Sequence, residues 1–190
     1  MTDIATNPNV LPDNIPAPQD DGGARHLAGM ALPDIALPAT SGPAVNLSKL
    51  NSRSVVYIYP RTGVPGVPNP DGWDMIPGAR GCTPQSCSFR DHAGELKALG
   101  VERIIGLSTQ DTAYQREAAE RLHLPFPVLS DEKLALTKAL KLPTFVADGM
   151  TLLKRMAWVV DDGKITKVFY PVFPPDKNAA EVIAWLRSSK

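Results

Sequence analysis

The chain has 190 residues, of which 43% are hydrophobic and 21% charged, which suits one globular domain with a full core plus an irregular appendage. Its 20 Lys and Arg residues balance its 20 Asp and Glu residues, so there is no basic field to attract nucleic acid or an anionic membrane. No apolar run approaches the roughly 18 residues of a membrane span, and the N-terminus lacks a signal-peptide pattern. We therefore expect a cytoplasmic protein with no nucleic-acid or membrane partner.

The N-terminal part of the sequence predicts an appendage followed by a buried strand. Residues 1–28 are polar and rich in proline, which predicts a disordered or loosely docked arm before a domain of residues 29–190. Short apolar pieces broken by proline and glycine follow as far as Leu50 and suggest brief strands and turns. The β-branched and aromatic run Val55–Tyr59 then predicts a strand that is buried on both faces and that ends at Pro60.

Residues 61–80 contain four prolines and four glycines and predict a long loop inserted into the domain. A structureless loop of this length inside a compact domain is usually functional. Because it leads from a buried strand to the first cysteine, we favour a functional loop. The alternative is a surface insertion pinned by its one large aromatic residue, Trp73.

The only two cysteines, Cys82 and Cys87, lie at the predicted start of a helix, which Thr83 is suited to cap and Pro84 to begin. A thiol at Cys82 would face unpaired backbone N–H groups and the positive end of the helix dipole, which favour the nucleophilic thiolate. Cys82 is therefore the candidate nucleophile. Because Cys87 lies five positions further on, it points away from Cys82 around the helix, and a disulfide between them requires the first turn or two to unwind.

The rest of the chain alternates between strand and helix patterns. The predicted elements are a buried strand at 103–108, a helix capped by Asp111 that runs to about His123, a short strand within 125–131, a helix over 132–142, strands joined by tight turns between 145 and 170, and a C-terminal helix from about Asp176. This order predicts an α/β sandwich with a parallel-to-mixed central sheet and a reactive group after the first buried strand.

Several motifs have the order and spacing that are typical of one known family. They are Tyr59-Pro60, the block from Gly81-Cys82-Thr83 to Arg90-Asp91 with its second cysteine, the run Leu124–Asp131, and the run Arg155–Gly163. From about Leu32 to Lys190 the chain thereby resembles the peroxiredoxins of the bacterioferritin-comigratory or Q type. The resemblance implies a thioredoxin-like, three-layer α/β sandwich with a mixed central sheet and a peroxidatic cysteine at a helix N-terminus.

The resemblance also implies a role for each site residue. Cys82 looks like the peroxidatic cysteine, Cys87 like the resolving cysteine, and Arg155 like the arginine that contacts both peroxide and thiolate. The implied function is a thiol-dependent peroxidase for hydrogen peroxide or organic hydroperoxides. A Cys82 sulfenic acid would become a Cys82–Cys87 disulfide, which a thioredoxin-like dithiol reduces. No metal or organic cofactor is implied, and we expect a monomer or weak homodimer.

The loop before Cys82 departs from the family pattern. Met75 stands where the family has a proline, and Ala79 stands where it has a threonine whose hydroxyl holds peroxide and thiolate. If Pro60 is the equivalent proline, the loop carries an insertion. The candidates to replace the hydroxyl are Thr62, Thr83 and Arg80, and the predicted substrate-binding residues are Pro60, Thr83 and Arg80.

The same cysteines are compatible with two other functions. One is a non-enzymatic redox sensor, in which Cys82–Cys87 oxidation unwinds the helix and changes a partner-binding surface near residues 61–80. The other is a protein disulfide oxidoreductase, which is disfavoured because such sites usually carry Cys-x-x-Cys. Metal binding is weaker still, since structural zinc requires four ligands and the three histidines are scattered.

Overall fold

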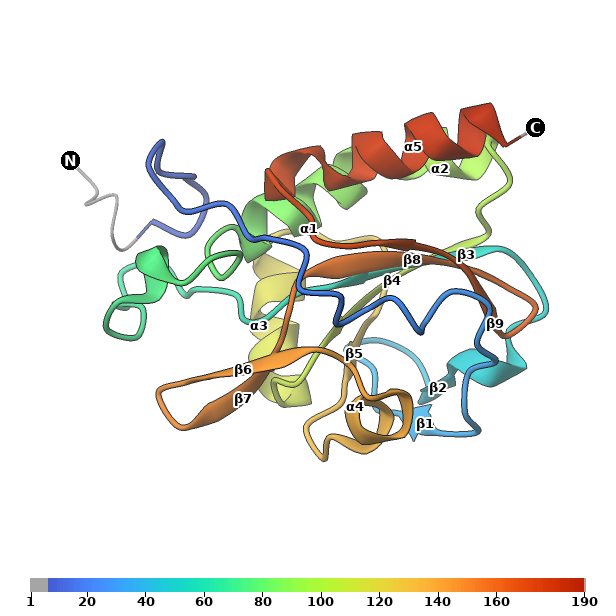
Figure 1. The fold of residues 1–190 in the computed structure, drawn as a ribbon, viewed down its shortest axis with the longest axis horizontal. Coiled ribbons are helices and arrows are strands. Elements are labelled where there is room, and N and C mark those ends of the chain that lie inside the picture. The colour runs from blue at the N-terminus through green and yellow to red at the C-terminus, as the bar shows by residue number, and fades with distance from the viewer. Residues whose placement is uncertain (1–6, 190) are drawn as a thin grey trace.

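A mixed five-stranded sheet forms the centre of the fold in the computed structural model, which describes residues 7–189 (Figure 1). The strand order is β5-β4-β3-β8-β9. In this order the first three strands run parallel to one another, whereas β8 is antiparallel to β3 and β9 is antiparallel to β8. The strands are β3 (Ser54–Ile58), β4 (Arg103–Ser108), β5 (Val128–Ser130), β8 (Met156–Asp161) and β9 (Lys164–Phe169). The predicted mixed sheet is confirmed.

Strand β3 is buried along its whole length, as its apolar sequence predicts. Because side chains alternate across a strand, Val55 and Tyr57 point into one hydrophobic cluster while Val56 and Ile58 point into the other. β3 thus contributes side chains to the hydrophobic cores on both faces of the sheet. The nucleophile candidate follows this strand after one loop.

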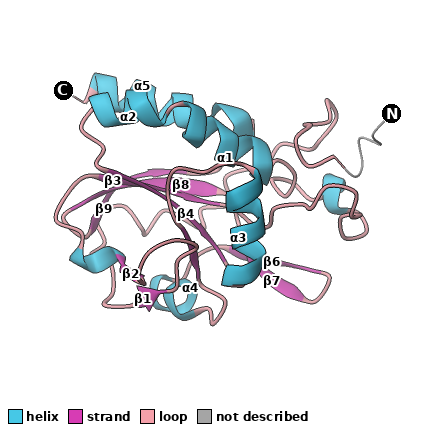
Figure 2. Cartoon of the chain, turned by 180° about the vertical axis from the view of Figure 1, so that it is seen from behind, coloured by secondary structure: helices cyan, strands magenta, loops and turns pink. Residues whose placement is uncertain are grey.

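Helices and short strands cover the two faces of the sheet (Figures 1 and 2). One face carries α1 (Cys82–Asp91), α2 (Ala93–Ala98) and α5 (Asn178–Ser188). The other face carries α4 (Ala135–Leu140) and the small antiparallel pair β1 (Ala36–Leu37) and β2 (Val45–Asn46). Helix α3 (Thr112–Arg121) packs beside β5. The arrangement is therefore three-layered.

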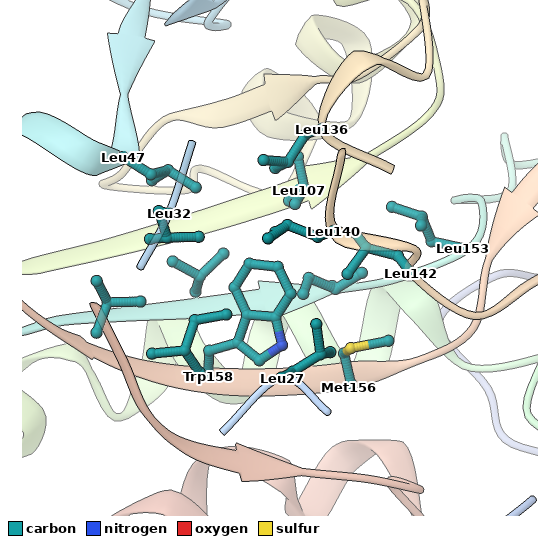
Figure 3. Packing of buried hydrophobic residues seen from close by; sticks show 14 of the residues in the cluster. Leu27, Leu32, Leu47, Leu107, Leu136, Leu140, Leu142, Leu153, Met156 and Trp158 are labelled. Carbon is teal, nitrogen blue, oxygen red and sulfur yellow. The ribbon is translucent and has the colours of Figure 1, made fainter. Parts of the chain in front are cut away.

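Trp158 of β8 lies in the core on the α4 face and is completely buried (Figure 3). Leucines from distant parts of the chain surround it, including Leu27 and Leu140. Leu27 belongs to the part of the sequence predicted to be an arm, and its side chain has 0% exposure. The described part of that segment therefore contributes to the core. Residues 1–6 of the predicted arm lie outside the described residues, and the division of the chain at residue 28 stays a prediction.

The loop at 61–80 is packed onto a β-hairpin outside the central sheet. This hairpin consists of β6 (Thr144–Ala147) and β7 (Met150–Leu153). Trp73, in a 3-10 turn of the loop, is buried against the hairpin, with its ring centroid 6.1 Å from that of Phe145. Trp73 thus fixes the loop that leads to Cys82.

One helix is divided in two, and another is shorter than predicted. The helix that begins at Cys82 divides into α1 and α2 at His92, whose ring contacts the Ser88 carbonyl at 2.8 Å. The helix predicted over 132–142 is shorter, since α4 begins at Ala135 and ends at Leu140. The Asp131 carboxylate sets this later start because it accepts the backbone N–H groups of Leu136 at 3.0 Å and Thr137 at 2.7 Å. The predicted cap of α3 is confirmed, since Asp111 accepts the N–H of Tyr114 at 2.8 Å. Within residues 7–189, no helix has the length and apolar character needed to cross a membrane.

Leu27→Ala should lower the free energy of unfolding by about 2–4 kcal/mol, because it leaves a cavity beside Trp158. Val10→Ala is the matched control, since Val10 lies in the same segment but is 36% exposed, and it should cost less than about 0.5 kcal/mol. Guanidinium denaturation measures both variants. Equal, small effects would contradict the placement of Leu27 in the core.

Candidate active site

Cys82 is the first residue of α1, and Gly81 is the residue that caps the helix. Gly81 has a positive φ of 105°, and its carbonyl accepts the N–H of Gln85 at 3.0 Å. The prediction that Thr83 caps the helix is therefore wrong. Thr83 lies inside the first turn, because the left-handed conformation at Gly81 starts the helix earlier.

Only glycine fits at position 81. A Cβ atom added there would lie 2.3 Å from Cγ of Pro175 and 2.8 Å from Cδ2 of Leu11. Pro175 begins the 3-10 turn that leads into α5, and Leu11 belongs to the N-terminal segment. Distant parts of the chain thus close over the start of α1.

Arg155 holds the residues around Cys82 in place. Its side chain is 3% exposed, and its Nη2 donates to Cys82 Sγ at 3.3 Å and to the backbone carbonyls of residues 78–80 at 3.1 Å each. Its Nη1 donates to Oε1 of Gln85. Cys82 is also 3% exposed, and its thiol points to the carbonyl of Ala79 at 3.6 Å. The structure therefore brings Cys82 and Arg155 together.

The charge of Arg155 has no carboxylate among these hydrogen-bond partners. Apart from Cys82, each acceptor is a neutral amide or carbonyl oxygen. A buried cation without a countercharge is unfavourable. Negative charge that develops near Cys82 would therefore be stabilised by this guanidinium.

Gln85 links Arg155 to the C-terminal helix. It is completely buried, and its Nε2 donates to Oδ1 of Asn178, the first residue of α5, at 2.9 Å. Sequence reasoning missed both residues. The spacing of Gln85 from Cys82, three positions along one helix, was the available signal, because such residues share a face. Asn178 carried no signal.

Cys87 lies five residues, more than one turn, beyond Cys82 on the same intact helix, and both thiols are free. It is half-buried, and burial raises the pKa of the Cys87 thiol, while the charge of Arg90 partly opposes that shift. The predicted Cys82–Cys87 disulfide requires a conformation other than this one.

Aromatic stacking holds α1 onto the sheet. Phe89 of α1 stacks on Tyr57 of β3 with ring centroids 4.7 Å apart, and Tyr57 in turn stacks on Tyr59 at 5.9 Å. Burial raises the pKa of both tyrosines, so they stay neutral beside the cysteine. The second half of α1 is thus anchored independently of Arg155.

The predicted substrate-binding residues have different surroundings. Pro60 is buried directly after β3. The Arg80 side chain is 4% exposed, and its guanidinium donates to the Asp74 carboxylate at 2.9 Å and to the carbonyls of Asn7 at 2.8 Å and Val10 at 3.2 Å. These partners lie in the loop and in the N-terminal segment. The roles of Pro60 and Arg80 in substrate binding stay predictions.

The missing threonine hydroxyl has two candidate replacements with similar properties. The hydroxyls of Thr62 and Thr83 are both buried and have no hydrogen-bond partner within residues 7–189. Ala79, at the position of the expected threonine, contributes its backbone carbonyl instead.

A cavity of about 480 Å³ adjoins the site on the side of Arg155. Its walls come from the N-terminal segment, the 61–80 loop and the strands around Arg155, with Phe145 and Lys154 among them. Among residues 7–189, no cluster of three or more His, Cys, Asp or Glu side chains is arranged to hold a metal ion.

Comparisons with known proteins place this geometry in a family. The Redoxin family matches residues 27–183. The chain is 31% identical over 169 residues to the chloroplastic peroxiredoxin Q of Sedum lineare, which covers 88% of this chain and 81% of that protein. The chain is a peroxiredoxin of the Q type. It is also 34% identical over 162 residues to the chloroplastic peroxiredoxin Q of Oryza sativa subsp. japonica.

The solved structures agree with the fold of this peroxiredoxin. Peroxidoxin BcpB from Mycobacterium tuberculosis has a TM-score of 0.67 and 27% identity, over 86% of this chain and 97% of that one. The predicted thioredoxin-like sandwich is thereby confirmed. The match to the rice protein covers 84% of this chain but 66% of that protein, slightly less than two thirds of its length.

Gly81→Ala should destabilise the peroxiredoxin by at least about 2 kcal/mol, because the new Cβ has an unfavourable φ and overlaps Pro175. Gly94→Ala is the matched control, since it lies in α2 with open space around it and should stabilise by about 0.5 kcal/mol. Thermal and guanidinium unfolding compare the two. A neutral Gly81→Ala would show that the strained turn is not required.

Proposed function

We propose that this peroxiredoxin is a thiol-dependent peroxidase that reduces hydrogen peroxide or organic hydroperoxides, with Cys82 as the peroxidatic cysteine. The observation that carries the proposal is the contact between Arg155 Nη2 and Cys82 Sγ at 3.3 Å at the N-terminus of α1. A guanidinium and unpaired helical N–H groups together favour negative charge on the sulfur and on an oxygen bound beside it.

In the first step the Cys82 thiolate attacks one oxygen of the peroxide. The O–O bond breaks, the attacked oxygen becomes the sulfenic acid, and the other oxygen takes a proton and leaves as water or alcohol. An ordinary thiol is already a few per cent ionised at neutral pH, so complete ionisation supplies only about thirtyfold in rate. Arg155 is the donor proposed to stabilise charge on the leaving oxygen, a role that is typically associated with about 3–4 kcal/mol.

In the second step Cys87 resolves the sulfenic acid. Its thiolate attacks the Cys82 sulfur, the S–OH bond breaks, and the hydroxyl leaves as water with one proton, which gives the Cys82–Cys87 disulfide. Because burial raises the pKa of Cys87, less thiolate is present at neutral pH than for an exposed cysteine. A thioredoxin-like dithiol then reduces the disulfide by exchange.

The remaining details follow the sequence expectations. Pro60, Thr83 and Arg80 contribute to substrate binding, and the protein acts in the cytoplasm as a monomer or weak homodimer. The roles of the three residues are supported by the resemblance and, for Arg80 and Thr83, by their positions next to Cys82 at the start of α1.

A redox sensor remains the second candidate, because both cysteines lie on one helix and oxidation must unwind it. A sensor and a peroxidase differ in turnover. Slow reaction with peroxide beside a large conformational change on oxidation would favour the sensor.

Peroxide loss in the presence of a thioredoxin system tests the peroxidase function. Cys82→Ser should abolish turnover, because it removes the nucleophile. Cys87→Ser should abolish turnover with thioredoxin but still form one sulfenic acid per chain, detectable by a sulfenic-acid probe and mass spectrometry. Equal turnover in the wild type and Cys82→Ser would overturn the peroxidase proposal, and full turnover in Cys87→Ser would overturn the resolving role alone.

Arg155→Lys should lower the second-order rate constant for Cys82 oxidation by about 100-fold, because a single ammonium cannot replace the fork that reaches the sulfur through Nη2 and Gln85 through Nη1. Arg53→Lys is the matched control, since Arg53 pairs with Asp161 away from the site, and it should change the rate constant by less than about twofold. Stopped-flow oxidation at several peroxide concentrations gives both values. An unchanged rate in Arg155→Lys would exclude Arg155 from the reaction.

A further inference from the structure

The N-terminal residues 7–21, which we call the strap, run over the turn that precedes Cys82. We call residues 78–81 the Cys82 turn. Arg80 of this turn donates through Nη2 to the backbone carbonyls of Asn7 at 2.8 Å and Val10 at 3.2 Å. Its Nη1 donates to the Asp74 carboxylate at 2.9 Å. The buried guanidinium thus joins the strap to the loop on which Cys82 depends.

The strap also packs against both ends of the Cys82 turn. At Gly81, Leu11 Cδ2 lies 2.8 Å from the position of an added Cβ, and at Gly78, Pro18 lies 3.5 Å from such a position. Side chains of the strap therefore occupy the space outside the turn. Arg155 occupies the inside, where it binds the carbonyls of residues 78–80.

An ion pair fixes the far end of the strap next to Arg155. The Asp21 carboxylate accepts from Lys154 Nζ at 2.6 Å and from the Tyr170 hydroxyl at 2.7 Å. These bonds hold the Asp21 pKa well below its usual value, so the carboxylate is charged throughout the neutral range. The strap is thus attached on both sides of the Cys82 turn.

The two chemical steps require opposite states of this turn. Attack on peroxide requires Cys82 in its folded position beside Arg155. Disulfide formation requires the first turn or two of α1 to unwind, since Cys82 and Cys87 lie five residues apart on one helix. When Cys82 moves, Gly81 and Arg80 move with it, and the contacts with Leu11 and the strap carbonyls break.

We propose that the strap is a latch on the Cys82 turn, with Arg80 as the positioning residue that joins them. It holds Cys82 in place for attack on peroxide, and its release limits the rate at which Cys87 displaces water from the sulfenic acid. The inference rests on the proposed peroxidase function. A slower release leaves the sulfenic acid exposed for longer to a second peroxide, which oxidises it to sulfinic acid and is itself reduced to water or alcohol.

The latch is tested by measuring the two steps separately. Reduced protein is mixed with hydrogen peroxide, quenched at intervals with acid and an alkylating reagent, and analysed by mass spectrometry for thiol, disulfide and sulfinic acid. Leu11→Ala removes the packing over Gly81, and Asp21→Ala removes the pairing with Lys154 at an exposed position. Asp13→Ala is the control, because it lies in the same strap and is exposed.

In Leu11→Ala and Asp21→Ala, loss of the thiol form should proceed within about twofold of the wild-type rate, because Arg155 and the remaining strap contacts still hold Cys82 in its folded position. Disulfide formation should be about fivefold faster, equivalent to about 1 kcal/mol. The sulfinic fraction at high peroxide should fall in parallel. Asp13→Ala should match the wild type in both steps.

Two results would overturn the latch. One is an unchanged rate of disulfide formation in both variants, and the other is an equal loss of rate in both steps, which would indicate a general structural role. Failure of the proposed function has a different signature, since wild-type Cys82 would then not be oxidised by peroxide at all.

Discussion

The hydrogen bonds of the buried Arg155 guanidinium organise the whole region around Cys82. One nitrogen contacts three successive carbonyls and the sulfur, and the other contacts Gln85, which reaches the first residue of α5. A lysine would supply the charge but not this geometry. A single side chain, which follows strand β7, therefore connects the turn at 78–80, Cys82 and, through Gln85, the C-terminal helix.

The sheet explains why this side chain meets Cys82. β3 and β8 are adjacent and antiparallel, with Ile58 paired to Met156, so the end of β3 lies beside the beginning of β8. Arg155 immediately precedes β8, and the loop that follows β3 returns to the same edge to begin α1. Two residues far apart in sequence thereby share one corner of the sheet, while the stacking of Phe89 on Tyr57 keeps α1 flat against it.

Most regular elements were predictable because local sequence determines them. The apolar run at 103–108 forms β4, and Asp111 caps α3 as its position suggests. Thr83 failed as a cap because the start of α1 is set by the contacts of Gly81 with Leu11 and Pro175, which no local propensity contains. The resemblance singled out Cys82 and Arg155, and the structure places them in contact. Gln85 and Asn178 could not be inferred, since their partners are defined only by the assembled fold.

Because Leu11 and Pro175 pack over Gly81, the order in which the chain is synthesised affects when the site can form. Cys82 lies between the two segments that cover its turn, one around Leu11 and the other around Pro175. During synthesis from the N-terminus, the strap leaves the ribosome before Cys82, whereas Pro175 and Asn178 leave it about ninety residues after Cys82. The surroundings of Cys82 are therefore completed only when α5 docks, so the nascent chain carries this cysteine without its final contacts until that helix has been synthesised.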